Sequence, residues 1–145
     1  MFFIDKLFKK RKLTIIGRVE NINIPSLDLY NIEAKIDTGA YRGAIHAENI
    51  EEIDKNGKKY LKFNLLDEDN EKYNHRKYEF TDYKVVRVRT TMTDFEERFA
   101  IPLKMEIAGR EIKTQLSLSS RKDMRFPILI GRKALKKRFL VDASI

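Results

Sequence analysis

The chain has 145 residues, of which 42% are hydrophobic and 36% charged, and it contains no cysteine. A chain of this length is expected to form one domain with a single core, and its nine Phe and six Tyr residues argue against wholesale disorder. The lack of cysteine excludes a disulfide framework, a cysteine-ligated zinc finger and a cysteine nucleophile. No apolar run in the sequence approaches the ~18 residues that a membrane-spanning helix needs.

The formal net charge of +8 is concentrated at the two ends of the chain. Residues 1–12 carry +4 and residues 121–145 carry +6, whereas residues 13–120 carry −2. A nucleic-acid module more often lines its binding face with Lys, Arg and interleaved aromatic residues. Two solvated basic ends, an acidic partner and a nucleic-acid partner remain alternative interpretations, with nucleic acid the least favoured.

Residues 1–12 form a basic amphipathic segment, in which apolar residues interrupted by Asp5 and Lys6 are followed by basic ones. A secretory signal has the opposite order, with its basic residues first. We expect a short amphipathic helix that packs on the domain or rests on an anionic surface. The sequence thus predicts a cytoplasmic protein, with residues 13–145 as a single domain.

The dominant pattern in residues 13–145 is a period-two alternation of apolar and polar side chains, which is typical of β-strands. Strands are expected over residues 13–24, 31–36, 44–53, 59–66, 85–89, 98–107, 111–119, 126–130 and 139–141. Asn56-Gly57 predicts a tight hairpin turn, and the polar residues 67–79 are expected to form a loop. Residues 133–138 are the one convincing internal helix. The pattern predicts an all-β barrel with one short C-terminal helix.

The tetrapeptide Asp37-Thr38-Gly39-Ala40 follows directly after an expected apolar strand. An acid at the end of a strand, followed by a hydroxyl and a glycine, can form a tight loop that presents its carboxylate. Gly39 would allow close approach of the backbone, and Thr38 could fix the loop by a hydrogen bond. Because Asp and Gly are common in turns, the tripeptide alone favours an ordinary turn.

A second element lies downstream, where the apolar run 128–130 ends in Gly131-Arg132 just before the expected helix. Together with Asp37-Thr38-Gly39, it resembles the retropepsin-like aspartic proteases, in which such a strand packs beside the catalytic loop and a terminal strand serves dimerisation. Further motifs resemble the bacterial and archaeal family named ATP-dependent zinc protease, which is described as related to a glutamate-ligase-associated protein. These motifs are Ala44-Ile45-His46-Ala47, Arg121, Asp123-Met124, Phe126-Pro127 and Ile130 to Leu135. The resemblance covers residues 15–143.

The resemblance implies an aspartic endopeptidase whose catalytic loop is Asp37, Thr38 and Gly39. Aspartic-protease hydrolysis uses two carboxylates that share one proton around a water molecule. This chain contains one Asp-Thr-Gly and no second copy. We therefore expect a C2 homodimer in which each subunit contributes one Asp37, with Thr38 bracing the paired loops across the two-fold axis.

Substrate contacts are expected from three parts of the chain. They are Ala40 and Tyr41, the hairpin-tip residues Met92, Thr93 and Asp94, and the residues Ile130, Gly131 and Arg132. The hairpin over residues 85–105 is either a flap that closes over substrate or an ordinary exposed hairpin. Viral retropepsins carry an acid where Tyr41 stands and pair it with the arginine after the late glycine, so the sequence leaves the partner of Arg132 open.

We expect no metal and no cofactor. A catalytic zinc needs about three His, Glu or Cys ligands, whereas the two histidines, His46 and His75, lie far apart in the sequence and no His-Glu-x-x-His occurs. No Gly-x-x-x-x-Gly-Lys-Ser/Thr loop is present either, so any ATP requirement would come from a partner. The apolar surroundings of His46 favour a structural histidine over a site residue, and Asp123 is also expected to be structural.

The leading hypothesis is a homodimeric aspartic endopeptidase. The alternative, kept open by the departure from the family pattern at Tyr41-Arg42-Gly43, is a catalytically inactive peptidase-fold module that binds peptide or protein partners. A basic β-barrel that binds nucleic acid rests on the charge alone. The resemblance implies an association with an ATP-grasp ligase that adds glutamate to proteins, and hence an acidic or glutamate-modified substrate, which the basic residues within 132–138 would suit.

Overall fold

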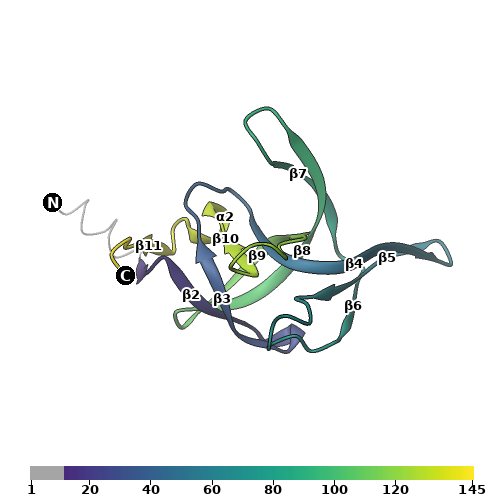
Figure 1. Ribbon diagram of the computed structural model, residues 1–145, viewed down its shortest axis with the longest axis horizontal. Helices are drawn as coiled ribbons and strands as arrows, with labels where there is room; N and C mark the ends of the chain where they lie inside the picture. Colours follow the sequence, from purple (N-terminus) through teal and green to yellow (C-terminus); the bar gives the residue numbers. More distant parts are fainter. Residues whose placement is uncertain (1–11) are drawn as a thin grey trace.

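The computed structural model describes residues 12–145, so the amphipathic helix expected near the N-terminus lies outside the described residues. The elements are β1 (Thr14–Ile16), β2 (Val19–Ile24), the 3-10 helix η1 (Pro25–Leu27), β3 (Leu29–Ile36), β4 (Gly43–Lys55), β5 (Lys58–Leu65), β6 (Lys77–Phe80), β7 (Lys84–Arg89), β8 (Phe95–Ile107), β9 (Arg110–Ser119), β10 (Ile128–Ile130), α2 (Arg132–Leu135) and β11 (Phe139–Val141). The expected all-β class with a short C-terminal helix is confirmed (Figure 1). Within residues 12–145, no helix is long and apolar enough to cross a membrane.

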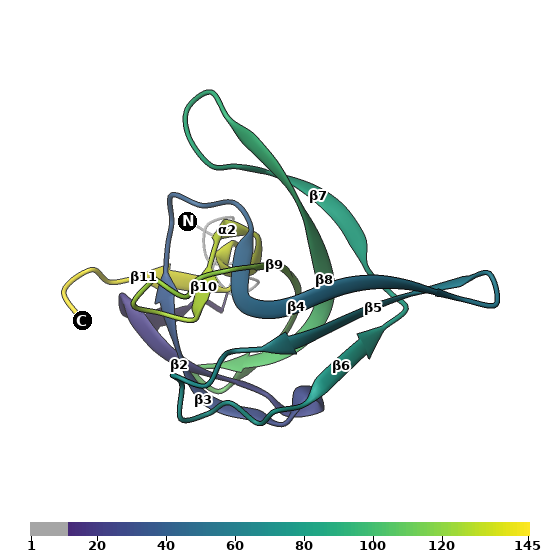
Figure 2. The same cartoon turned by 45° about the vertical axis from the view of Figure 1, so that its right-hand side comes forward.

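The strands form a sheet that returns on itself. Its order is β10-β3-β2-β8-β9-β4-β5-β6, β7 pairs with β8, and β10 also pairs with β4, which closes a ring of strands. A separate two-stranded sheet joins β1 to β11 in parallel. The β4–β5 and β7–β8 hairpins extend beyond the ring in two different directions (Figures 1 and 2).

The core follows the period-two pattern of the strands. In β3, Ile32, Ala34 and Ile36 are buried while Glu33 and Lys35 are exposed, because successive side chains point to opposite faces of a sheet. β9 shows the same alternation in its first half, with every second side chain in the core. The predicted alternation in these two strands is confirmed, and it brings the end of β3 to the rim of the ring.

The expected continuous strand over residues 13–24 is wrong, because the chain breaks at Gly17 and Arg18. There it contacts the C-terminus: the N–H of Arg18 donates to the carbonyl of Ile145 at 2.9 Å, and a Cβ on Gly17 would lie 2.6 Å from the same oxygen. On one side of the break β1 pairs with β11, and on the other β2 pairs with β3 and β8. One uninterrupted strand could not reach both sets of partners.

The predicted range of the loop, residues 67–79, is too long at its C-terminal end, because β6 begins at Lys77. Tyr78 is buried, stacks on Phe63 with ring centroids 5.9 Å apart, and donates its hydroxyl to the carbonyl of Leu27. A strand of four residues with one fully buried side chain has too little alternation to stand out from its polar surroundings.

The internal helix is shorter than expected, since α2 ends at Leu135 rather than Arg138. Lys136 is already extended, and Lys137 takes the left-handed conformation with φ of 67°. These two residues turn the chain so that Phe139 can pair with Thr14. The predicted turn at Asn56-Gly57 is confirmed, because both residues have the positive φ values that a tight hairpin of this type requires.

Candidate functional site

The site is built around the end of β3, which pairs in parallel with β10. Ile36 lies opposite Ile130, and the N–H of the next residue, Asp37, donates to the Ile130 carbonyl at 2.9 Å. The sheet therefore fixes the backbone of Asp37 itself rather than leaving it to the loop. This places the start of the Asp-Thr-Gly sequence directly beside Gly131.

The Asp37 carboxylate is held locally and remains accessible. The N–H of Gly39 donates to Asp37 Oδ1 at 2.9 Å, and the N–H of Ala40 approaches the Asp37 carbonyl at 3.3 Å. Asp37 is half-buried, whereas Thr38 and Gly39 are exposed. The loop thus orients one carboxylate oxygen with a main-chain donor and presents the acid at the surface of the protein.

The loop that follows Asp37 rests on the backbone at the start of α2. The N–H groups of Arg132 and Lys133 donate to the carbonyls of Ala40 and Tyr41 at 2.8 and 2.9 Å, which satisfies donors that the first turn of a helix leaves free. A Cβ on Gly131 would lie 2.7 Å from the Tyr41 carbonyl and 2.8 Å from that of Ala40. Only glycine permits this close approach.

Arg132 has partners that the sequence did not reveal. Its Nη1 donates to the Thr38 carbonyl at 3.1 Å, and its guanidinium lies 5.8 Å from the centre of the Tyr41 ring. The guanidinium of Arg42 lies at the same distance from that ring. An aromatic face attracts cations, so Tyr41 occupies the position of the acid in viral retropepsins without leaving Arg132 unpartnered.

The Asp37 loop and the outer part of the β7–β8 hairpin line one hollow of about 610 Å³. In Figures 1 and 2 this hairpin rises on the same side of the ring as the loop between β3 and β4. The residues that line the hollow are Asp37, Gly39, Ala40, Tyr41, Arg42, Arg87, Val88, Arg89 and Phe95. Three arginines therefore surround a single acid.

The hairpin contributes to the hollow through the strand residues next to its tip, where Arg89 pairs with Phe95, rather than through the turn itself. Arg87 and Arg89 place their guanidinium groups 4.1 and 4.9 Å from the centre of the Phe95 ring, so all three side chains lie together. Sequence reasoning missed these three residues. The available signal was the alternation of Arg87 and Arg89, which puts two cations on one face of a strand.

The residues expected to bind substrate lie in different parts of the structure. Ala40 and Tyr41 line the hollow, whereas the tip residues Met92, Thr93 and Asp94 do not. The tip is closed on itself, with the N–H of Asp94 donating to Thr91 Oγ1 at 3.0 Å. The buried residues Ile130 and Gly131 lie beneath the loop, where they support it.

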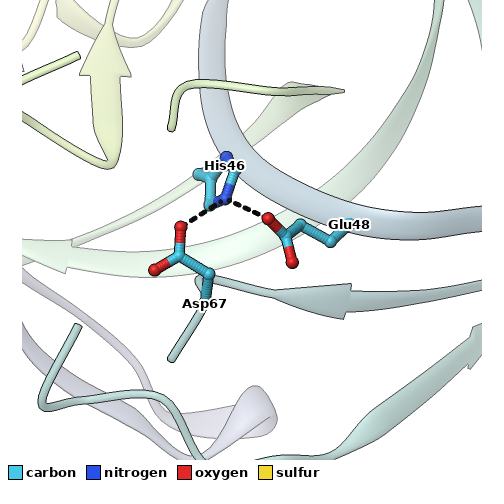
Figure 3. A group of neighbouring side chains, drawn as sticks. All are labelled: His46, Glu48 and Asp67. Atoms are coloured by element: carbon cyan, nitrogen blue, oxygen red, sulfur yellow. Dashed lines mark ion pairs between the residues drawn. The ribbon is translucent and has the colours of Figure 1, made fainter. Parts of the chain in front are cut away.

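His46, which is 3% exposed, lies between three segments of the chain (Figure 3). Its Nδ1 accepts a hydrogen bond of 2.7 Å from the N–H of Arg121. Its Nε2 lies 2.9 Å from Asp67 Oδ2 and 3.3 Å from Glu48 Oε1. The imidazole thus connects β4, the segment after β5 and the segment before β10.

The His46, Glu48 and Asp67 side chains are close enough to suggest a metal site, and a zinc ion is what the zinc-protease name would imply. The hydrogen bond from Arg121 requires a lone pair on Nδ1, which puts the proton of a neutral imidazole on Nε2. A metal-bound histidine instead donates through its second ring nitrogen and binds through the unprotonated one. These residues therefore do not fit a metal, and the geometry supports the structural role expected for His46.

Arg121 stabilises the same region of the structure as His46. Its Nε donates to the Phe126 carbonyl at 3.1 Å, close to the start of β10. Burial lowers the pKa of the Arg121 guanidinium and the charge of Arg98 acts in the same direction, whereas the negative charge of Asp37 opposes them. His46 and Arg121 thus stabilise the segment that leads into the strand on which Asp37 depends. Asp123, the other acid near these motifs, is exposed.

A ring of strands with an Asp-Thr-Gly loop anchored on an apolar strand, and a helix directly after that strand, defines the retropepsin-like class of aspartic peptidases. The chain belongs to the RimB-like family, described as retropepsin-like aspartic endopeptidase RimB, which matches residues 15–145. The match confirms the retropepsin-like resemblance at the level of the family and covers nearly the same residues.

Among curated proteins, the chain is 28% identical over 130 residues to a probable alpha-L-glutamate ligase of Shewanella halifaxensis. It is also 28% identical over 133 residues to a protein of the same name in Desulfotalea psychrophila. In both comparisons the alignment covers 90% of this chain, which spans only 28% of the relative's length.

A solved structure, that of protein Lpg0085 from Legionella pneumophila, is described as having unknown function. It is similar to this chain with a TM-score of 0.68 and 28% sequence identity, over 91% of this chain and 95% of that one. This likeness covers nearly the whole described fold.

We predict that Gly131→Ala destabilises the protein by about 1–3 kcal/mol, because the added methyl group would overlap two main-chain carbonyls that cannot move without breaking the Asp37 loop. Gly39→Ala is the matched comparison, since its Cβ would meet only Asp37 Oδ1 at 3.2 Å. Urea denaturation of both variants measures the difference. Equal stability of the two variants would contradict the close packing described above.

We also predict that exhaustive dialysis against EDTA leaves the melting temperature unchanged, because the His46 cluster does not fit a metal. Metal analysis of the purified protein should find less than stoichiometric zinc. Stoichiometric zinc that is lost in a His46→Gln variant, together with a lower melting temperature after EDTA treatment, would show that our assignment of the Nε2 proton is wrong.

Proposed function

We propose that the protein is an aspartic endopeptidase that hydrolyses peptide bonds with two Asp37 carboxylates, one from each of two subunits. The observation that carries the proposal is the accessible Asp37 carboxylate at the end of β3, in a loop whose backbone is anchored by Ile130, Arg132 and Lys133. An ordinary surface turn does not need hydrogen bonds from its backbone both to a buried strand and to the start of a helix.

The proposed chemistry uses one charged and one protonated Asp37 around a water molecule. The charged carboxylate takes a proton from the water as its oxygen attacks the peptide carbonyl carbon, and the protonated carboxyl donates its proton to the carbonyl oxygen. The carboxyl that took the water proton then gives it to the amide nitrogen, and the other carboxylate takes back a proton from a hydroxyl of the tetrahedral intermediate as the C–N bond breaks. In this scheme Thr38 and Gly39 position the acids, with Thr38 bracing the loops across the two-fold axis.

An apolar face on the small β1–β11 sheet supports the proposed homodimer. Ile15 and Leu140 are paired in register, and their side chains are 63% and 52% exposed. Ile145, at the C-terminus, is 61% exposed. Neighbouring exposed apolar side chains on a short sheet gain free energy when a second copy of the chain covers them.

The charge of the hollow supports an acidic or glutamate-modified protein substrate. Arg42, Arg87 and Arg89 line it together with Asp37 as the one acid. Guanidinium groups bind carboxylates with two parallel hydrogen bonds, so side chains of Glu or Asp next to the cleaved bond would be favoured. The names of the curated relatives as glutamate ligases are consistent with this chemistry and with a functional association with an ATP-grasp ligase.

A binding module without peptidase activity is the second candidate. The exposed Tyr41, with its flanking arginines, stands where the family pattern has other residues, and the same hollow would hold an acidic peptide without cleaving it. The two candidates differ in one respect only, which is whether Asp37 acts on the bound peptide.

Asp37→Asn should abolish cleavage of an acidic peptide, with a loss of at least about a thousandfold in kcat/KM, because neither proton transfer can then take place. Asp82→Asn is the matched control, since Asp82 is exposed and lies outside the hollow. Cleavage would be followed by mass spectrometry and folding by circular dichroism. Cleavage by the Asp37→Asn variant at the wild-type rate would refute the assignment of Asp37.

Leu140→Asp should shift the protein from dimer to monomer, because it places a charge in the apolar face on β11. Analytical ultracentrifugation would show the shift, and specific activity should fall with it. Val85→Asp is the matched control, because Val85 is 55% exposed on β7, away from that face. A wild-type protein that sediments as a monomer while it cleaves peptides would rule out the shared dyad.

A further inference from the structure

A second hollow, which we call the basic groove, lies beside the Asp37 site between β9, α2 and the start of β11. Its volume is about 540 Å³. It is lined by Tyr41, Arg110, Lys113, Thr114, Lys133, Lys136, Lys137 and Arg138. Six of these eight residues are cations, and none is an acid.

Three cations of the basic groove, Arg110, Lys133 and Arg138, donate to main-chain or amide oxygens rather than to carboxylates. Arg110 donates to the carbonyls of Lys12 and Arg138, and Arg138 donates to that of Ala134. In the part of the chain that the structure describes, none of the six cations forms an ion pair. Their positive charges therefore remain available to a ligand.

Several positive charges lie close to Lys133. Burial lowers the pKa of its ammonium group, and the nearby cations Arg42, Lys84 and Lys136 act in the same direction. Like charges placed together destabilise the folded chain through mutual repulsion. An anion bound in the basic groove would relieve this repulsion.

The basic groove adjoins the Asp37 hollow. Tyr41 lines both. The side-chain oxygen of Gln115 accepts hydrogen bonds from Arg42 Nη1 at 3.1 Å and from Lys133 Nζ at 2.7 Å, and these two cations belong to the hollow and to the groove respectively. The Gln115 amide thus links a cation of the hollow to a cation of the groove.

We propose that the basic groove is an exosite that binds an acidic stretch of the peptide substrate outside the cleaved segment. The inference rests on the proposed function for the role of the bound peptide, but binding itself does not require cleavage. Nucleic acid is the less favoured ligand, because Tyr41 is the one aromatic residue lining the groove and a single-strand site stacks successive bases on several aromatic rings.

The test measures binding in the Asp37→Asn background, so that no cleavage interferes. Lys113→Glu combined with Lys136→Glu reverses two exposed charges of the groove. Lys59→Glu combined with Lys77→Glu makes the same change in net charge on β5 and β6, at exposed residues outside both hollows. The probe is a fluorescent peptide of about ten glutamates, followed by anisotropy at low salt, with circular dichroism as the check on folding.

The groove pair should weaken binding of the glutamate peptide by about tenfold or more, whereas the control pair should change it by less than about threefold. An equal loss in the two pairs would overturn the exosite, because the attraction would then depend only on net charge. Tighter binding of a single-stranded oligonucleotide of equal charge would overturn it as well. If the wild-type protein does not cleave peptides but the difference between the pairs remains, the proposed peptidase fails and the exosite stands.

Discussion

The pairing of β3 with β10 is the interaction on which the rest of the site depends. It is parallel and very short, yet it ends in the hydrogen bond from the Asp37 N–H to the Ile130 carbonyl. β10 also pairs with β4, through Ile128 and Leu129, and this pairing closes the ring of strands. The same short strand therefore closes the sheet and positions the acid, and its side chains Ile128 and Ile130 are fully buried.

Support for this strand comes from residues that do not touch the hollow. Gly131 lets the Asp37 loop lie directly on the backbone, and His46 holds the segment before β10 through the N–H of Arg121. The tautomer that this hydrogen bond imposes explains why a histidine between two carboxylates suits a structural role and not a metal. The His46 cluster thus has a structural role, and in the proposed function the chemistry belongs to the Asp37 carboxylate at the surface.

The fold gathers many of the chain's basic residues at two hollows. Basic residues from β7, from the segment after Asp37, from β9 and from α2 line the two adjoining hollows. In the proposed function, a field of one sign around a single acid would favour an anionic substrate and raise its local concentration. The same field would repel basic peptides, so the proposed site would discriminate between acidic and basic peptides.

The sequence by itself determined the all-β class, the alternation in β3 and β9, the turn at Asn56-Gly57 and the Asp-Thr-Gly loop. These features are local: a period of two, a turn dipeptide or a short motif is visible in adjacent residues. Only the tertiary structure decided the break at Gly17, the pairing of β6, the partners of Arg132 and the convergence of Arg42, Arg87 and Arg89. Each of these depends on contacts between segments far apart in the chain, which no local pattern records.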